Sequence, residues 1–192
     1  LYLVLNSPGG EVDSGMNLIE MIKGLKHPVD TVTIFSASMS FVISQYAGKR
    51  YMIDSGTMMG HPAFAGGMEG TVPGSLIIRT NHLLNQIYEI NNVIANRMGI
   101  DEGTYEDLIA NELWMTGAKA LAAGAADELV ALRCDKSLDG PGEVQSFDLM
   151  GFSIEVVFHK CPLITAPLSI KMGNFSSKQL EAEELMQKVF IH

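Results

Sequence analysis

Apolar and polar positions alternate along the first half of the chain in blocks that predict strands followed by helices. Residues 1–5 form a continuous apolar run typical of a buried strand, and residues 12–25 carry apolar side chains at helical spacing. The β-branched residues within 31–35 predict a second strand, and residues 41–47 predict a second helix. Strands that alternate with helices favour parallel pairing, so this pattern predicts an α/β core.

A long amphipathic helix is predicted for residues 75–98, after a glycine-rich stretch over residues 65–74. Shorter helices are predicted for residues 101–108 and 118–123, and residues 125–130 return the chain to the sheet. The apolar positions of the long helix drift over a wide face, as in a helix that packs on two sides. These positions are Leu76, Ile77, Leu83, Leu84, Ile87, Ile90, Val93, Ile94 and Met98.

The pattern changes in the last third of the chain. Residues 135–142 have the composition of a linker, residues 147–158 alternate as strands do, and residues 176–190 predict an acidic amphipathic helix. We therefore expect two domains, residues 1–132 and residues 133–192. The second is a C-terminal extension in which we recognise no chemical motif.

Composition argues against several classes of function. The chain has 192 residues, 47% of them apolar, and a net charge of −9 without basic clusters. Nucleic-acid binding is not expected, because phosphate contacts need Lys and Arg. No apolar stretch reaches membrane-spanning length without polar interruption, so no membrane association is expected. Cys134 and Cys161 lack the spacing of metal ligands and are compatible with a reducing compartment. We expect a cytoplasmic protein without metal or other cofactor.

Ser38 stands between the second predicted strand and its helix. A strand-to-helix turn lifts a side chain out of the core, and the free amides of the first helical turn favour an oxyanion at the same spot. Taken alone, Ser36, Ser38 and Ser40 are also typical helix caps. His61, further along the chain, is the candidate base that would make Ser38 a nucleophile.

A similar strand-turn-helix unit opens the chain, where residues 6–10 read Asn-Ser-Pro-Gly-Gly. Pro8 fixes its own φ angle, while Gly9 and Gly10 allow the backbone to approach a substrate closely and to aim an N–H group at it. A backbone donor of an oxyanion hole needs this freedom, although the same residues are also typical of an ordinary turn.

The two units together, in this order, resemble the proteolytic subunit of the Clp protease, the ClpP family, over residues 1–131. The likeness is carried by an opening motif, a nucleophile motif and the approach to a histidine. These are residues 6–10 with Gly15 and Met16, residues 37–39, and residues 48–51 with residues 58–61.

This resemblance implies a ClpP/crotonase-like α/β fold of repeated strand-turn-helix units. Residues 75–98 would be the handle helix, which interleaves between two rings in that family. The second glycine of the opening motif and the residue after the serine donate the oxyanion-hole amides in the family, which carries over to Gly10 and Met39. His61 falls at the position of the family's base.

The acid of the triad departs from the family pattern. Residues 111–120 resemble the segment in which the family carries an aspartate, and the matching position is Glu112. A glutamate can orient and charge-stabilise a histidine, but its extra methylene shifts the geometry. Asn111 and Asp107 are alternative partners for His61, and the other interpretation of Glu112 is a solvated charge at a helix end.

The resemblance implies a serine endopeptidase in which Ser38 attacks the peptide carbonyl, His61 transfers the proton and Glu112 orients His61. The glycine-rich stretch is expected to bind peptide or unfolded protein as an added strand. The residues expected to contact substrate are Gly9, Gly66, Gly67 and Met68.

A ring-shaped homo-oligomer that encloses the active sites is the assembly implied by the resemblance, with an unfolding ATPase as candidate partner. The chain lacks an initial Met, and its first residue already lies inside a predicted strand. We therefore expect a processed, truncated or incomplete chain, which leaves docking of the ATPase open.

Three other functions fit parts of the sequence. A protease like signal peptide peptidase A would use a Ser-Lys pair, with Lys49 or another lysine reaching Ser38. An acyl-CoA enzyme of the crotonase fold would polarise a thioester with two backbone amides and need no serine. A catalytically inactive ClpP-like scaffold is suggested by Glu112 and the long extension.

Overall fold

The structure of the chain is a computed structural model that divides into two compact units, Leu1–Ala131 and Leu132–His192. Each unit has its own β-sheet. The described residues are 1–64, 66, 69–149, 152–161, 163–164 and 167–173.

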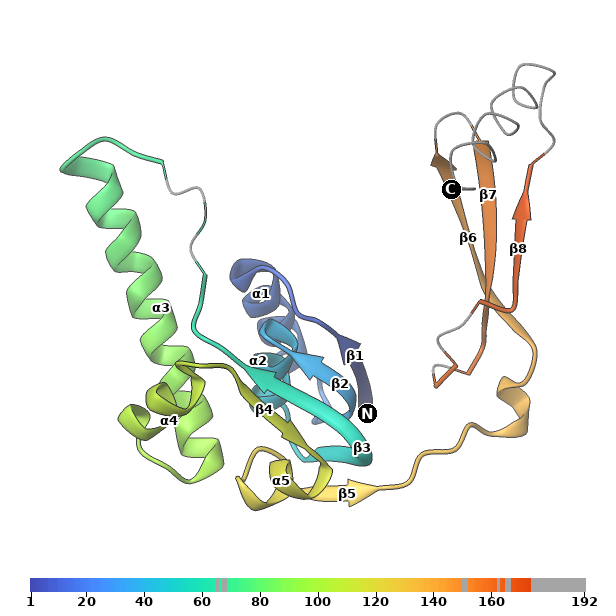
Figure 1. Cartoon of the computed structure of the whole chain (residues 1–192), viewed down its shortest axis with the longest axis horizontal. Coiled ribbons are helices and arrows are strands. Elements are labelled where there is room, and N and C mark those ends of the chain that lie inside the picture. The colour runs from blue at the N-terminus through green and yellow to red at the C-terminus, as the bar shows by residue number, and fades with distance from the viewer. Residues whose placement is uncertain (65, 67–68, 150–151, 162, 165–166, 174–192) are drawn as a thin grey trace, which may run out of the picture. The chain divides into compact units, whose positions relative to one another are not determined.

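The first unit is built on a five-stranded sheet (Figure 1). Its strands are β1 (Tyr2–Ser7), β2 (Asp30–Ala37), β3 (Arg50–Gly60), β4 (Leu113–Thr116) and β5 (Glu128–Val130). The strands β1, β2 and β3 are parallel neighbours in that order. The last four residues of β3 pair antiparallel with β4, and residues near its start pair parallel with β5. The long strand β3 therefore joins all later parts of the sheet.

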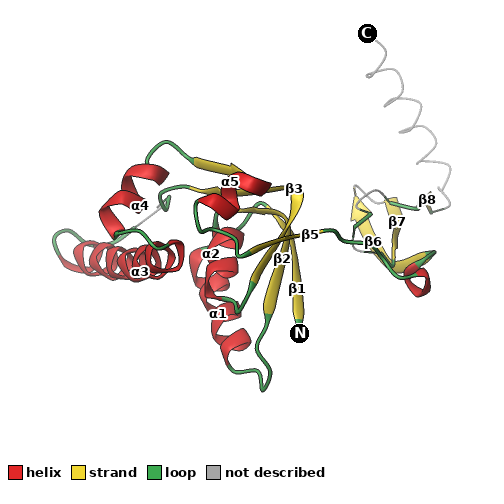
Figure 2. Ribbon diagram, turned by 90° about the horizontal axis from the view of Figure 1, so that it is seen from below, coloured by secondary structure: helices red, strands yellow, loops and turns green. Residues whose placement is uncertain are grey.

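Helices cover this sheet and extend the unit away from it (Figure 2). They are α1 (Val12–Lys23), α2 (Met39–Tyr46), α3 (Gly74–Met98), α4 (Glu102–Ile109) and α5 (Gly117–Ala122). Helix α2 packs against β1, β2 and β3, and both α1 and α3 contact α2. Helix α4 packs on α3, and α5 packs against β3, β4 and β5. The mixed α/β fold with a parallel sheet and a long handle helix confirms the predicted fold class.

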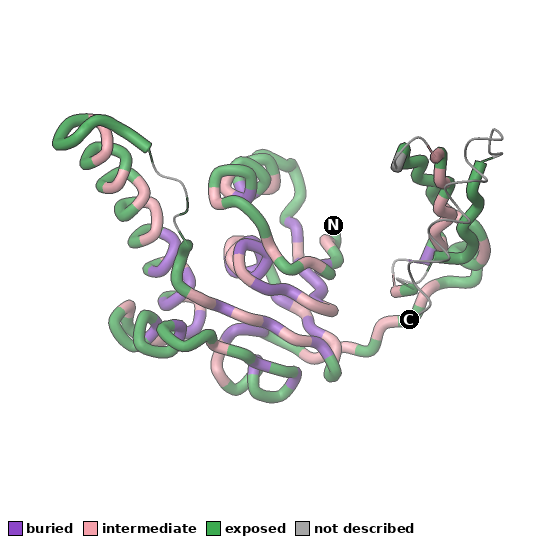
Figure 3. Tube along the Cα trace, turned by 45° about the horizontal axis from the view of Figure 1, so that its top comes forward, coloured by how far each residue is buried: buried purple, intermediate pink, exposed green. Residues whose placement is uncertain are grey.

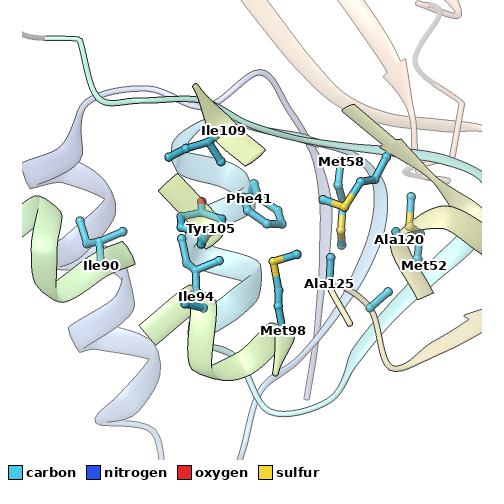
Figure 4. Packing of buried hydrophobic residues seen from close by; sticks show 13 residues of the cluster. Phe41, Met52, Met58, Ile90, Ile94, Met98, Tyr105, Ile109, Ala120 and Ala125 are labelled. Atoms are coloured by element: carbon cyan, nitrogen blue, oxygen red, sulfur yellow. The ribbon is translucent and has the colours of Figure 1, made fainter. Parts of the chain in front are cut away.

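The apolar core of the first unit joins α2, α3 and α4 to β3 (Figure 4). Phe41 of α2, Met52 and Met58 of β3 and Ile94 of α3 are each at most 1% exposed. Burying a side chain of this size contributes about 1.5–3 kcal/mol relative to leaving it in water. The buried residues of α3 lie in its second half, while its first half is largely exposed (Figure 3). The long helix is therefore anchored at one end only within a single chain.

A buried polar network ties α2 to the sheet. The Gln45 side chain donates to the carbonyl of Ala125 at 3.0 Å and accepts from Arg50. Arg50 is 4% exposed and also donates through Nε to Asp127 Oδ2 at 3.1 Å. The backbone N–H of Arg50 donates to the same oxygen at 2.8 Å. Because Arg50 opens β3 and Asp127 directly precedes β5, this ion pair holds the two strands together.

The second unit contains a three-stranded antiparallel sheet in the order β6 (Pro141–Leu149), β7 (Phe152–His159) and β8 (Ser169–Met172). The strands predicted for residues 147–158 are confirmed as parts of β6 and β7. The expected linker over residues 135–142 instead contains a short 3-10 helix, η1 (Lys136–Leu138), and the start of β6.

The two cysteines form a disulfide between Cys134 and Cys161, with their Cα atoms 5.8 Å apart. This disulfide argues against the expectation that the cysteines are compatible with a reducing compartment, because disulfides persist mainly in oxidising compartments. The sequence could not show the pairing, since 27 residues separate the two positions and only the turn back through β7 brings them together. The cytoplasmic location stays a prediction.

Other expectations differ from the structure or lie outside it. The sequence did not predict β3, because Asp54, Ser55 and Gly56 interrupt its apolar alternation. It also missed the short strands β4 and β8. The helix predicted for residues 176–190 lies outside the described residues. Within the part of the chain that the structure describes, no helix has the length and apolar character needed to cross a membrane.

We expect Asp127→Asn to lower the free energy of unfolding by about 2–3 kcal/mol at neutral pH, because it leaves buried Arg50 without its charge partner. Hydrogen bonds from Arg50 lower the pKa of Asp127 in the folded protein. The carboxylate therefore stabilises the fold fully above about pH 4, where carboxyl groups of the unfolded chain are ionised. This contribution is lost as the pH falls through the lowered pKa.

Urea unfolding of both proteins, followed by circular dichroism at neutral and at acidic pH, measures this effect. The stability difference between the parent and Asp127→Asn should shrink at the acidic pH. A difference of the same size under both conditions would contradict the assigned role of the ion pair.

Candidate active site

The candidate residues converge because the parallel strands β1, β2 and β3 end at the same edge of the sheet. In the strand register Ser7 lies beside Ser36, and Ala37 lies beside Met59. The glycine turn after β1, Ser38 after β2 and His61 after β3 therefore all leave the sheet at neighbouring points. In open α/β sheets this carboxyl edge is where ligands bind.

Ser38 holds an unusual backbone conformation, with φ 56° and ψ −127°. Positive φ is uncommon for a residue with a side chain, and such strained residues cluster at functional sites. The N–H of Ser38 donates to the carbonyl of Met59 at 2.9 Å, and its own carbonyl accepts the N–H of Val42 at 3.1 Å. The turn is thus held by the sheet on one side and by the first turn of α2 on the other.

The Ser38 hydroxyl points to His61. Its Oγ lies 2.8 Å from His61 Nε2, within hydrogen-bond distance, and both residues are partly exposed. Ser38 makes no side-chain capping bond to α2, so the capping interpretation does not describe its hydroxyl. Ser36 and Ser40 are buried and bond to each other, with their Oγ atoms 2.9 Å apart. Only Ser38 of these three serines therefore presents its hydroxyl to a candidate base.

Gly9 lies directly against the Ser38 turn. It has φ 102°, and a Cβ atom built on it would lie 2.6–2.8 Å from the Ala37 carbonyl oxygen, Ser38 Cβ and Met39 N. A side chain at this position is excluded by both space and backbone conformation. A Cβ on Gly10 would meet nothing within 4 Å, so Gly10 borders open space. Gly9 was predicted to contact substrate, and the structure gives it a tight packing position beside the serine.

A cavity of about 390 Å³ opens beside Ser38 and His61. Gly10 and Met39 also line it, so the two predicted oxyanion donors border the same space as the serine. Its remaining wall comes mainly from apolar residues of α2, α3 and α4, namely Phe41, Val42, Ile87, Ile90, Ile94 and Tyr105, with Asn91 as a polar member. Burial raises the pKa of the Tyr105 phenol, so Tyr105 stays uncharged, and Glu11 is the ionisable acid in the lining.

The predicted acid takes a different partner. Glu112 is exposed, has φ 63° and accepts a hydrogen bond from the indole Nε1 of Trp114 through Oε2 at 2.9 Å. Among the described residues, no carboxylate oxygen lies within 4.0 Å of a His61 ring nitrogen, and this includes the alternative acid Asp107. Asn111 is exposed as well. The contact of Glu112 with His61 stays a prediction.

The remaining predicted site residues lie elsewhere or outside the described chain. Gly66 is exposed, and Gly67 and Met68 are not among the described residues. Lys49, the candidate partner in a Ser-Lys pair, bonds Glu128 and lies over the ring of Tyr51. Within the described ranges, no three His, Cys, Asp or Glu side chains cluster as metal ligands would.

Sequence reasoning missed Trp114. Strand alternation gave no signal for its bond to Glu112, because Glu112 precedes β4 and has a positive φ. The cavity residues Tyr105 and Asn91 were also missed, since their helices meet only in the folded chain.

We expect Gly9→Ala to lower the rate at which Ser38 reacts with a fluorophosphonate by about 100-fold. Its new methyl group would push against Ser38 and Met39, and a displacement of about 1 Å at a reacting group can cost that much. The rate is measured by stopping the labelling reaction at a series of times and determining the labelled fraction of the protein from its intact mass.

Gly24→Ala is the matched control, because a Cβ there meets only ordinary contacts at 3.5 Å and Gly24 lies in the αR region. Its labelling rate should equal that of the parent. Equal rates for Gly9→Ala and Gly24→Ala would show that the tight contact does not position the serine.

Known proteins resemble this chain over about two thirds of its length. The profile of the family described as Clp protease matches residues 1–133. An ATP-dependent Clp protease proteolytic subunit from Streptococcus gordonii is 30% identical over 137 residues, covering 68% of each chain. Subunits of the same name from Streptococcus pyogenes and Streptococcus equi are 29% identical over 133 residues, again covering 68% of each chain. The family match spans well over half of the sequence, and the chain belongs to the Clp protease family.

Proposed function

We propose that the first unit is a serine endopeptidase that hydrolyses peptide bonds. The observation that carries the proposal is the 2.8 Å contact between Ser38 Oγ and His61 Nε2, made at a strained strand-to-helix turn beside an apolar cavity. Membership of the Clp protease family supports the same activity. We assign the protease to residues 1–132 and give the extension no catalytic role.

The chemistry follows from this contact. With the ring proton on Nδ1, His61 Nε2 accepts the hydroxyl proton while Ser38 Oγ attacks the substrate carbonyl. The imidazolium then returns the proton to the leaving amine, and water resolves the acyl-enzyme by the same route. In this proposal Glu112 orients His61 and stabilises its positive charge. The acid must approach His61 for that role, since it bonds Trp114 in the structure.

The oxyanion hole in this proposal consists of the N–H groups of Gly10 and Met39. Met39 is the first residue of α2, so its N–H belongs to the helix end that carries partial positive charge. Gly10 follows the glycine that packs against the Ser38 turn. Each donor of this kind contributes about 3 kcal/mol to the stability of the transition state.

The substrate in this proposal is a peptide or an unfolded protein. The apolar lining of the cavity suits an apolar side chain next to the cleaved bond, because a cavity walled by isoleucine and phenylalanine offers few polar partners. Gly66, Gly67 and Met68 would bind the substrate main chain as an added strand, a mode that tolerates many sequences.

Assembly into a ring is part of the proposal. The first half of α3 exposes Ile77, Ile78, Leu84 and Tyr88, which a single chain leaves without cover. An apolar helix face of this kind is typical of a contact between copies. The relatives are named as subunits of an ATP-dependent protease, and we propose that a separate unfolding ATPase delivers substrate here as well.

One observation favours a second candidate, the inactive scaffold. The Glu112 carboxylate is engaged by Trp114 and not by His61, so the triad is incomplete in the structure. A crotonase-like acyl-CoA enzyme gains less support, because it has no use for the contact between Ser38 and His61.

We expect one phosphonyl adduct per chain after fluorophosphonate treatment, and none in Ser38→Ala. His61→Ala should lower the labelling rate by about 100-fold or more, because general base catalysis contributes 10²–10⁴-fold. Glu112→Ala should lower it by at least about ten-fold, since the imidazole loses its orienting partner. Intact mass and rates of peptide cleavage measure these effects.

No adduct on the native, assembled protein would favour the scaffold. An adduct that persists in Ser38→Ala would assign the reactive group to another residue and overturn the proposed nucleophile. Native mass far above 20.8 kDa is expected for the ring, and a monomer at every concentration tested would count against it.

A further inference from the structure

Trp114 forms a hydrogen bond with one carboxylate oxygen of Glu112, the predicted acid of the triad. Its indole N–H donates to Glu112 Oε2 at 2.9 Å, and both side chains are exposed, Trp114 by 51%. Trp114 lies in β4 and Glu112 directly precedes that strand. The bond therefore links two positions of one segment that are separated by Leu113 alone.

The backbone brings Glu112 to His61, although the side chains do not meet. Strands β3 and β4 pair antiparallel with Met59 opposite Trp114 and Gly60 opposite Leu113. Gly60 and Leu113 are the last residues of this pairing, and the next residue along the chain is His61 on one side and Glu112 on the other. Side chains opposite each other on antiparallel strands start about 4.5–5.5 Å apart, so a glutamate next to the last pair starts within reach of the histidine.

The carboxylate thus has two candidate partners and is bonded to one of them. Among the described residues, no carboxylate lies within 4.0 Å of a His61 ring nitrogen, so the bond to Trp114 and a bond to His61 do not coexist in this structure. Because φ of Glu112 is positive, its side chain does not point in the direction of a strand residue. The glutamate side chain, which is one methylene longer than aspartate, extends to the Trp114 indole.

We propose that Trp114 is a positioning residue that holds the Glu112 carboxylate away from His61. The resting site is then a pair of Ser38 and His61, and the acid joins His61 only when the bond to Trp114 breaks. This inference rests on the proposed function, because it assigns a state to the triad of that same site. A hydrogen bond of ordinary strength at an exposed position favours the withheld state by roughly five-fold.

The test is Trp114→Phe, which keeps an aromatic ring at the position and removes the N–H donor. We expect kcat for peptide cleavage and the rate of fluorophosphonate labelling to rise by about three- to six-fold, with KM unchanged, because a five-fold bias leaves about one sixth of the molecules with the acid on His61. A change in kcat alone separates the release of the acid from an effect on substrate binding.

Glu112→Ala supplies the matched background. Trp114→Phe should have no effect on the labelling rate when Glu112 is already alanine, because the substitution acts through the carboxylate. A lower rate in Trp114→Phe, or the same change in both backgrounds, would overturn the proposed role. Denaturation midpoints of all variants identify any that fail to fold.

A second measurement does not require changing Trp114. Trp114 is the only tryptophan in the chain, so intrinsic fluorescence reports on its surroundings alone. Glu112→Ala should shift its emission spectrum, because the indole loses its acceptor. Glu128→Ala is the control, since that carboxylate bonds Lys49 instead and its loss should leave the spectrum unchanged. An unchanged spectrum in Glu112→Ala would overturn the contact itself.

These outcomes separate the two proposals. Failure of Ser38 to label in the parent and in Trp114→Phe would remove the proposed protease, and the role of Trp114 with it. Labelling that depends on Ser38 but does not respond to Trp114→Phe would leave the protease standing and remove only the withheld acid.

Discussion

Ser38 is kept in a backbone conformation that residues with side chains rarely adopt, and neighbouring parts of the fold hold it there. Its N–H bonds to β3, its carbonyl opens the hydrogen bonding of α2, and Gly9 packs against its Cβ. Strain of this kind costs about 1–3 kcal/mol, comparable to the two backbone bonds that oppose it. Everything else in the site depends on this turn, because it alone sends the hydroxyl toward His61 and leaves the first amides of α2 free.

The buried polar network around Arg50 stabilises the start of β3, at the end of the sheet opposite to Ser38 and His61. Arg50 fixes the start of β3 to Asp127 and to Gln45 of α2, while His61 follows the end of the same strand. The long strand therefore joins a charged, hydrogen-bonded network at one end to the sheet edge where Ser38 and His61 meet. The pairing of Phe35–Ala37 with Thr57–Met59 places the end of β3 beside the Ser38 turn, and His61 follows that end by one residue.

Local pattern was enough to predict the alternating strands and helices of the first half of the chain and the Ser38 turn, whereas for the glycine pair it also fitted an ordinary turn. The contact between Ser38 and His61 also followed, through the resemblance to a known family. The strand β3 could not be predicted, since Asp54, Ser55 and Gly56 mask its period. The bond between Glu112 and Trp114 depends on the directions of two side chains. The disulfide depends on the return of the chain through β7, and apolar periodicity encodes neither of these features.

The disulfide also determines how the second unit responds to tension. Cys134 precedes β6 and Cys161 follows β7, so the covalent bridge closes a loop around this whole hairpin. A force applied along the chain passes through the two sulfur atoms and bypasses β6 and β7. The strand β8 lies outside the loop and can be peeled away first. As long as the bridge is intact, a machine that threads extended polypeptide would meet a two-stranded obstacle here, and reduction would convert it into a single thread.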